Sequence, residues 1–220
     1  MAEARTLDEI KLDYAYKFGA GRYVQQKEAL ELAAEEIRRL GKKPFIIAGP
    51  RAWEATEGRM EKALKEAGMA YELSLYPGQN TYEKAKEHAA KAIESGCDVI
   101  IGAGGGRIMD QAKAAAYYGG MELSLPSGHM PVVQVPTSIA TCAAFAPLSV
   151  MYTEEGASLG SLRHHFEVDA ILVDMDVIAK EPARYVASGI LDGMSKMVEM
   201  QNGHDHIDIE EFDVGLVTAF

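Results

Sequence analysis

The chain has 220 residues, of which 48% are hydrophobic and 25% are charged. This composition is typical of a globular protein of one or two domains, and it excludes disorder or a coiled coil as a description of the whole chain. Acidic residues outnumber basic ones by 33 to 22, which gives a net charge of −11. We therefore expect neither a nucleic-acid partner nor a membrane partner.

The two cysteines, Cys97 and Cys142, do not make a disulfide framework or a zinc finger. The first ten residues carry acids and no apolar run, so we expect no signal peptide. No stretch approaches the roughly 20 apolar residues that cross a bilayer. These features predict a soluble protein of a reducing compartment, most simply the cytoplasm.

Short apolar runs alternate with helical stretches along most of the chain. An aromatic segment that includes Tyr23 is expected to form a first strand. Further strands are expected at residues 45–48, 71–76, 98–101, 132–135, 149–153 and 170–173. Helices are expected at residues 25–40, 53–67, 81–95 and 104–118. This alternation predicts βαβ units and an α/β fold with a doubly wound, mostly parallel sheet that is covered on both faces.

The pattern changes near Ile178, after which the sequence predicts only helices, at residues 181–190 and 191–200. We expect an α/β dinucleotide-binding domain at residues 1–178 and the start of an all-helical domain at residues 179–220. A helical domain that is incomplete should expose apolar surface. We therefore expect self-association, and a homo-oligomer as the functional form.

The strongest local signal is the run Gly104, Gly105 and Gly106, which follows an apolar strand and opens a helix. Glycines let the backbone pass close to a ligand, and the amino end of the helix offers N–H groups and partial positive charge to a phosphate. Asp110 and Lys113 lie near one face of that helix, where Asp110 could fix the loop or bind a ribose hydroxyl and Lys113 could bind an oxyanion. The alternative is a tight turn with an ordinary surface ion pair.

A second signal follows the strand expected at residues 132–135. Thr137, Ser138 and Thr141 supply hydroxyl groups just after this strand ends. Ligands of doubly wound folds bind at the carboxyl ends of the strands, so these hydroxyls are candidates to hydrogen-bond a ligand. The alternative is a buried turn of small residues that packs against the sheet.

Four motifs occur in a specific order: Gly-Gly-Gly-x-x-x-Asp-x-x-Lys from Gly104, Pro-Thr-Ser-x-x-Thr from Pro136, Leu-Ser-Val-x-Tyr from Leu148 and Gly-Ile-x-Asp from Gly189. Together they resemble the iron- or zinc-dependent alcohol dehydrogenase superfamily, which shares its fold with dehydroquinate synthase. The chain is most similar to the glycerol dehydrogenase-like branch. Within it, residues 140–149 look most like the hydroxycarboxylate dehydrogenases, which reduce 2-oxo acids.

The resemblance implies a nicotinamide cofactor, NADP or NAD, and a divalent metal, zinc or iron. It implies that Gly104 to Gly106 hold the cofactor pyrophosphate, with Asp110 nearby. The residues that should line the nicotinamide half are Thr137, Ser138, Thr141, Leu148 and Tyr152. Asp192 matches the superfamily's aspartate ligand to the metal, which polarises the substrate oxygen while a hydride moves to or from the nicotinamide.

Two departures from the superfamily pattern bear on specificity. Cys142 stands where glycerol dehydrogenases carry an aspartate in the substrate site, so an acid substrate is expected to be tolerated better than glycerol. The strand at residues 45–48 usually ends in an aspartate that accepts the ribose hydroxyls, whereas here Gly49, Pro50 and Arg51 follow it. We expect NADP to be preferred, since no carboxylate repels its 2′-phosphate and an arginine is close. The alternative is that Arg51 only faces water.

A third departure concerns the metal. The two histidine ligands of the superfamily would lie beyond residue 220, and Asp192 alone is too few for a catalytic site, which has three protein ligands. We therefore expect a chain that lacks most of its C-terminal helical domain, or a short relative without the metal. His164 and His165 are interpreted as loop residues, with the alternative that one faces the active cleft.

The sequence thus favours a metal-assisted oxidoreductase that transfers a hydride between NAD(P) and a small 2-oxo or 2-hydroxy acid. Glycerol or another polyol or alcohol is the alternative substrate. A nucleotide-binding module without turnover and a synthase of the dehydroquinate synthase type are the alternatives from other functional classes.

Overall fold

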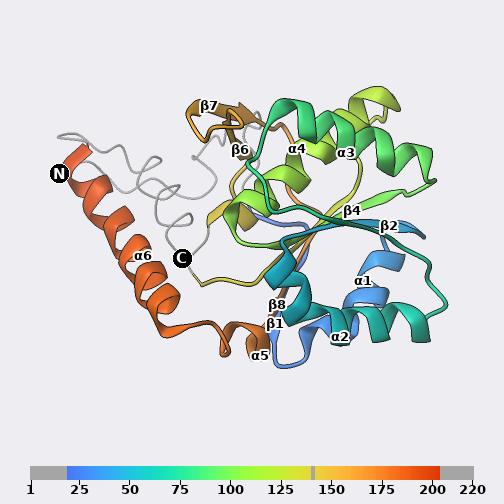
Figure 1. Ribbon diagram of the computed structural model, residues 1–220, viewed down its shortest axis with the longest axis horizontal. Helices are drawn as coiled ribbons and strands as arrows, with labels where there is room; N and C mark the ends of the chain where they lie inside the picture. Colours follow the sequence, from blue (N-terminus) through green and yellow to red (C-terminus); the bar gives the residue numbers. More distant parts are fainter. Residues whose placement is uncertain (1–18, 140–141, 204–220) are drawn as a thin grey trace, which may run out of the picture.

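The computed structural model describes residues 19–139 and 142–203, and its centre is a six-stranded sheet (Figure 1). The strand order is β1-β8-β5-β4-β2-β3, and every neighbouring pair runs parallel. The strands are β1 (Tyr23–Gln26), β2 (Pro44–Ala48), β3 (Glu72–Leu75), β4 (Val99–Gly104), β5 (Val132–Pro136) and β8 (Ala170–Asp174). The predicted parallel α/β sheet is confirmed.

The three central strands, β2, β4 and β5, are buried along their whole length. Their side chains alternate between two hydrophobic clusters: Ile46 and Ile101 face one, and Phe45 and Ile100 face the other. A strand that is covered on both faces must be apolar at successive positions. This constraint explains why these strands were the clearest ones in the sequence.

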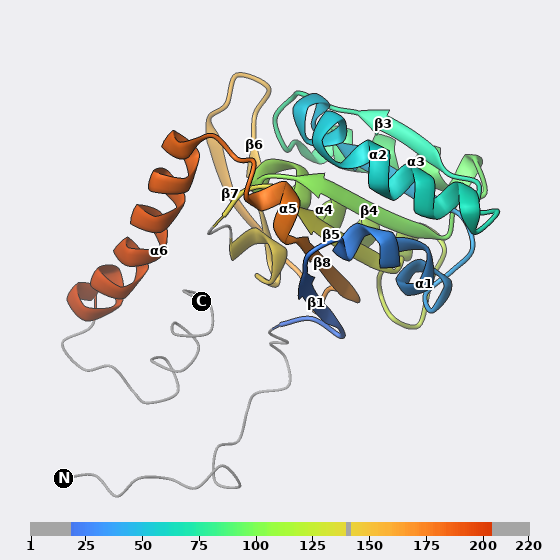
Figure 2. The ribbon, with the colours of Figure 1, turned by 90° about the horizontal axis from the view of Figure 1, so that it is seen from below.

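Helices cover both faces of the sheet, as Figure 2 shows. The 3₁₀-helix at Ala29–Leu32, α1 (Ala33–Arg38) and α2 (Pro50–Glu66) pack on one face. On the other face lie α3 (Tyr82–Glu94) and α4 (Gly106–Glu122). The sheet is therefore doubly wound, as the alternation of strands and helices predicts.

The helix expected at residues 25–40 is wrong in its first half. Tyr23 to Gln26 instead pair with β8 as an edge strand, in agreement with the first strand expected at Tyr23. Glu28 then adopts a left-handed backbone conformation, with φ of 58°, which ends the strand and prevents a continuous helix. Leu30, Ala33 and Ile37 are buried at helical spacing, and this pattern produced the longer prediction.

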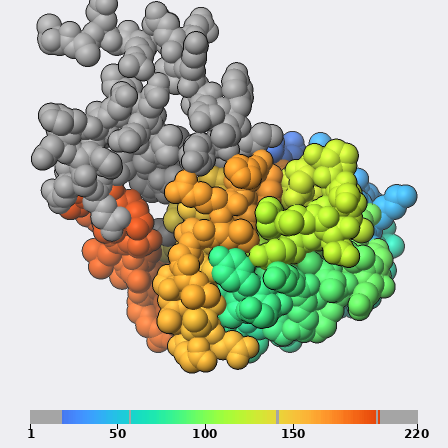
Figure 3. Space-filling view, turned by 90° about the horizontal axis from the view of Figure 1, so that it is seen from above, coloured from blue at the N-terminus to red at the C-terminus, as the bar shows by residue number. Residues whose placement is uncertain are grey.

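A two-stranded antiparallel hairpin stands apart from the main sheet. It consists of β6 (Leu148–Tyr152), which was expected, and β7 (Ser158–Arg163), which was not. β7 is mostly exposed and has the sequence SLGSLR, so it lacks the apolar run that marks the other strands. Figure 3 shows the hairpin on the surface between the last helix and the layer of α3 and α4.

The chain leaves β8 through α5 (Met175–Ile178) and enters α6 (Ala183–Gly203). The sequence predicted two helices over this last segment, and the structure has one continuous helix. Most of α6 stands clear of the sheet (Figures 1 and 2), and it exposes the apolar residues Ile190, Leu191, Met194 and Val198. Among the described residues, no helix is long and apolar enough to span a membrane. The domain division at residue 178 stays a prediction.

Gly102, in β4, tests how closely the sheet and α4 pack. A methyl group on Gly102 would lie 2.6 Å from both Ala112 Cβ and Gln134 Oε1, so Gly102→Ala should lower the free energy of unfolding by about 1–3 kcal/mol. Gly58 lies in α2 with open space around it, so Gly58→Ala should raise that free energy by about 0.5–1 kcal/mol. Urea unfolding measures both variants. Equal effects of the two substitutions would contradict the described packing.

Candidate functional site

The candidate site begins where the strand order reverses. β2 leads through α2 to β3 on one side, whereas its neighbour β4 leads through α4 to β5 on the other side. In open α/β sheets such a switch point leaves a crevice outside the carboxyl ends of the strands, where ligands bind. Gly49 caps α2 and Gly105 caps α4, so the amino ends of two helices flank this crevice.

The loops at the crevice are tied together by backbone hydrogen bonds. The amide of Gly49 donates to the carbonyl of Ala103 (3.3 Å), and the amide of Thr137 donates to the carbonyl of Gly104 (3.1 Å). The segments after β2, β4 and β5 therefore meet at one edge of the sheet. The predicted residues Gly49, Gly104 and Thr137 belong to a single region of the structure.

The glycine loop forms one wall of a pocket of about 500 Å³. Its lining residues are Gly105, Gly106, Arg107, Ile108, Asp110, Val150 and Tyr152. Position 104 has no room for a side chain, because a Cβ on Gly104 would lie 2.8 Å from Ile108 Cβ. The first N–H groups of a helix have no partner within the helix, so the amino end of α4 can bind an anion in this pocket.

Four predicted cofactor residues line this pocket: Gly105, Gly106, Asp110 and Tyr152. Sequence reasoning missed Arg107, an exposed cation in the first turn of α4 whose Nη1 donates to Gln79 Oε1 (3.2 Å). Its position directly after the glycines was the available signal, since a cation there can meet the phosphate that the helix end attracts.

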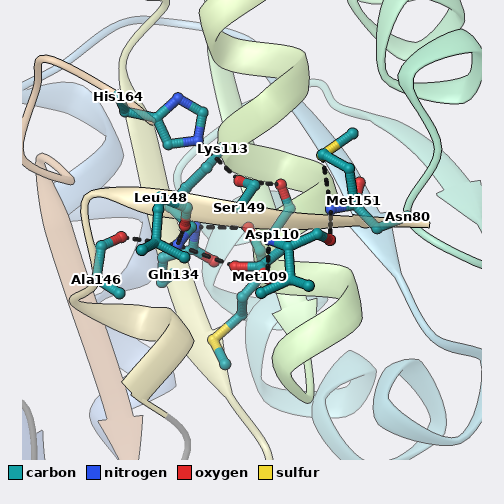
Figure 4. Close-up of polar contacts among 11 residues, drawn as sticks. Asn80, Met109, Asp110, Lys113, Gln134, Ala146, Leu148, Ser149, Met151 and His164 are labelled. Atoms are coloured by element: carbon teal, nitrogen blue, oxygen red, sulfur yellow. Dashed lines mark hydrogen bonds and ion pairs between the residues drawn. The ribbon is translucent and has the colours of Figure 1, made fainter. Parts of the chain in front are cut away.

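Lys113 is buried (Figure 4). It is therefore not part of a surface ion pair, and its ammonium group is not free to bind an oxyanion. Its ammonium group donates to the carbonyl of Ala146 (2.8 Å) and to the carbonyl of Leu148, and it lies 3.0 Å from Asp110 Oδ1. Burial lowers the pKa of Lys113 and raises the pKa of Asp110, and each charge opposes the shift of the other. The ammonium group thus donates to two backbone carbonyls, and the Asp110 carboxylate lies beside it as an ion-pair partner.

Further bonds hold β6 against α4, as Figure 4 shows. Asp110 Oδ2 accepts from the amide of Val150 (2.9 Å), and Asn80 Nδ2 donates to the carbonyl of Val150 (2.8 Å). Ser149 Oγ donates to the carbonyl of Asp110 (2.8 Å) and lies 2.8 Å from His164 Nε2. Because Ser149 gives its hydroxyl proton to Asp110, His164 must donate from Nε2 to Ser149 Oγ. His164 lies in the loop after β7, as expected, but it is buried and has a structural role that the sequence did not predict.

The other predicted site residues are spread around the crevice. Ser138 faces the glycine loop, since a methyl group on Gly105 would lie 3.8 Å from Ser138 Oγ. Leu148 is half-buried and contributes its carbonyl to Lys113. Cys142 is exposed and lies in a short 3₁₀-helix, Cys142–Ala144. Thr141 lies outside the described residues.

Arg51 is exposed in the first turn of α2, at the far side of the crevice from the hairpin. Its charge acts on Tyr185 at the start of α6, where Arg184 mainly, and Arg51 to a lesser extent, lower the pKa of the Tyr185 hydroxyl. Arg184 Nη2 donates to that hydroxyl (3.3 Å). Two cations and a hydroxyl thus gather beside the amino end of α2.

Asp192 does not stand in a metal site built from the described residues. It is exposed on α6, and its Oδ1 lies 3.9 Å from Lys196 Nζ. Within the described residues, no three histidine, cysteine, aspartate or glutamate side chains gather as a metal site requires. The potential ligands in this part of the chain are too few for a catalytic metal. The role of Asp192 as a metal ligand stays a prediction.

The buried ion pair predicts a large effect of removing one partner. Lys113→Met should cost about 3–5 kcal/mol of unfolding free energy, because it leaves the Asp110 carboxylate buried without a counter-charge. The double variant Asp110→Asn with Lys113→Met should cost less than Lys113→Met alone, since no unpaired charge stays buried. Urea unfolding of both proteins measures the difference. A double variant as unstable as the sum of its single variants would contradict the pairing.

Buried His164 predicts that stability falls in acid. Burial lowers the pKa of His164 from 6.5 to about 3, and the Lys113 charge adds to this shift. The unfolded chain binds more protons between these values, so the stability that the neutral ring contributes is complete above pH 6.5. That stability is then lost by up to about 1.4 kcal/mol per pH unit as the pH falls toward 3.

His164→Asn keeps a side-chain donor for Ser149 and removes this titration. Unfolding free energies at pH 7 and pH 5 should therefore differ less in His164→Asn than in the wild type. His88, whose pKa burial lowers to about 4, contributes equally to both proteins. Identical losses in the two proteins would refute the assignment.

The chain resembles proteins of one enzyme family. Residues 20–175 match the family model described as iron-containing alcohol dehydrogenase. Glycolaldehyde reductase of Halobacterium salinarum is 30% identical over 84% of this chain and 49% of its own. Hydroxycarboxylate dehydrogenase A of Escherichia coli is 36% identical over 70% of this chain and 39% of its own.

The fold is also similar to that of a solved structure whose name points to the same kind of enzyme. The crystal structure of a probable glycerol dehydrogenase from Sinorhizobium meliloti superposes with a TM-score of 0.71 and 27% identity, covering 83% of this chain and 47% of that one. The chain spans about half the length of the curated relatives it matches. The matched family model covers most of the chain and includes the glycine loop and the hairpin. This chain belongs to the iron-containing alcohol dehydrogenase family.

Proposed function

We propose that the crevice at the switch point binds a nicotinamide dinucleotide, and that the whole protein is an oxidoreductase that acts on CH–OH groups. The observation that carries the proposal is the pocket formed by Gly105 and Gly106 at the amino end of α4, beside the junction of β2 and β4. A dinucleotide needs a site for its pyrophosphate at the carboxyl edge of a parallel sheet, and this pocket has that chemistry.

The bound cofactor supplies or accepts the hydride, and the residues of this chain bind and orient it. The glycine loop and the helix end receive the pyrophosphate, and Arg107 adds a positive charge at the same pocket. The β6–β7 hairpin, held by Lys113 and Asp110, forms the opposite wall through Val150 and Tyr152. The described residues contain no group of three potential metal ligands, so Asp192 alone would not hold a catalytic metal in this part of the chain.

For the cofactor, we propose NADP rather than NAD. The residue after β2 is Gly49, so no carboxylate is present there to repel a 2′-phosphate. Arg51 stands in the next turn, and Arg184 and Tyr185 lie beside it. Guanidinium groups bind phosphate through charge-assisted hydrogen bonds, so this cluster supports the phosphorylated cofactor.

For the substrate, we propose a small 2-oxo or 2-hydroxy acid. Cys142 carries no negative charge at the position that the family resemblance assigns to the substrate site, and an anionic substrate tolerates a thiol there better than a carboxylate. The Escherichia coli relative is named as acting on a hydroxycarboxylate, and it is 36% identical. A polyol is the alternative, which the named activity of the Sinorhizobium meliloti structure supports.

The cofactor proposal predicts an affinity difference. The chain should bind NADPH at least about tenfold more tightly than NADH in a fluorescence titration, and Arg51→Ala should remove most of that difference. Gly49→Asp should reverse the preference, because its carboxylate repels the 2′-phosphate and accepts the ribose hydroxyls of NADH.

Arg38→Ala is the matched control, because Arg38 is an exposed arginine on α1 that donates to the carbonyl of Ala67. It should leave both affinities unchanged. Equal binding of the two cofactors by the wild type would refute the NADP assignment. Binding of neither cofactor would refute the proposed function.

The substrate proposal predicts consumption of NADPH when a small 2-oxo acid is added, and slower consumption with dihydroxyacetone. Absorbance of the reduced nicotinamide follows both reactions. Faster turnover of dihydroxyacetone would favour the polyol alternative, and cofactor binding without turnover of either compound would make this chain a binding module.

A further inference from the structure

Glu181, in the turn between α5 and α6, contacts the loop that follows β5. Its Oε2 accepts a hydrogen bond from the backbone amide of Ile139 (3.0 Å), 42 positions away in the sequence. Its Oε1 is buried and has no hydrogen-bond partner among the described residues.

The turn that carries Glu181 is itself fixed. The amide of Glu181 donates to the carbonyl of Ile178 (3.0 Å), and Pro182 restricts the backbone of the residue before it. Asp174 is the N-cap of α5, and its buried carboxylate contacts Arg59 (3.1 Å) and the amide of Leu30 (3.2 Å). The backbone at Glu181 is therefore held by its own contacts, so its side chain can fix the position of the loop.

A second contact joins α6 to the same residue of the loop. Gly189 packs so closely that a Cβ there would lie 2.6 Å from both the carbonyl oxygen and Cγ2 of Ile139. At its other end the loop is bonded to β4 through the amide of Thr137 and the carbonyl of Gly104 (3.1 Å). Ser138 lies between these two anchors, facing Gly105.

We propose that Glu181 is a positioning residue that fixes residues 137–139 against the glycine loop. Cofactor affinity then depends on the position of α6 relative to this loop. The proposal rests on the proposed function for its consequence, cofactor affinity, but the anchor itself can be measured without a ligand. Glu181 acts through the backbone of Ile139 and not by direct contact with the cofactor.

The test compares Glu181→Ala, Glu181→Gln and the control Glu122→Ala, an exposed glutamate at the end of α4. Hydrogen exchange of the Ile139 amide, followed by NMR, should be about tenfold faster in Glu181→Ala because its acceptor is lost. Affinity for NADPH should fall about tenfold in the same variant, with a melting temperature within about 2 °C of the wild type. Glu181→Gln should restore both properties, because its amide oxygen can accept the same bond.

Gly189→Ala provides an independent variant. Alanine favours a helix over glycine, so α6 should gain intrinsic stability. The added methyl group displaces Ile139, and cofactor affinity should nevertheless fall. A merely structural role would move stability and affinity in the same direction.

The outcomes separate the anchor from the proposed function. An unchanged exchange rate of the Ile139 amide in Glu181→Ala overturns the anchor, and so does a wild-type affinity for NADPH in that variant. A wild type that binds no nicotinamide cofactor, together with faster exchange in Glu181→Ala, supports the anchor and overturns the proposed function. Equal losses of affinity in Glu181→Ala and Glu181→Gln also count against the proposal.

Discussion

The side-chain nitrogen of Lys113 is buried inside the protein, and the candidate site is built around it. A buried cationic group needs hydrogen-bond acceptors and a counter-charge, and here two backbone carbonyls accept from Lys113 while the Asp110 carboxylate lies 3.0 Å away. The carbonyls belong to residues 146 and 148, which lead into β6, whereas Lys113 belongs to α4. Satisfying one charge therefore fixes the hairpin relative to the helix whose amino end forms the pocket.

The geometry of the pocket follows from this constraint and from the topology of the sheet. The reversal of strand order places the amino ends of α2 and α4 on opposite sides of one crevice, and the glycines after β4 keep that crevice open to a ligand. Asp110 has a double role, because it neutralises Lys113 and accepts from the amide of Val150 while its residue lines the pocket. The fold, the electrostatics and the opening for a ligand are thus consequences of the same few contacts.

The sequence predicted those features that depend on local patterns. The buried strands and the glycine turn have such patterns, because full burial demands apolar runs and close backbone approach demands missing side chains. β7 and the contacts of Lys113, His164 and Glu181 were not predictable in this way. β7 is mostly exposed and has no apolar run. The three side chains bond to residues 15–42 positions away in the sequence, and no local pattern marks such contacts. The unbroken helix predicted over residues 25–40 failed for a related reason, since its first residues pair with β8.

The central claim is that the amino end of α4 receives the pyrophosphate of a nicotinamide dinucleotide. A crystal structure of this chain with NADP⁺ tests it most directly. We expect phosphate oxygens within about 3 Å of the amide nitrogens of Gly105 and Gly106. A cofactor bound elsewhere, for example in the pocket between Arg22 and His129 at the amino ends of the strands, would rule out this binding site.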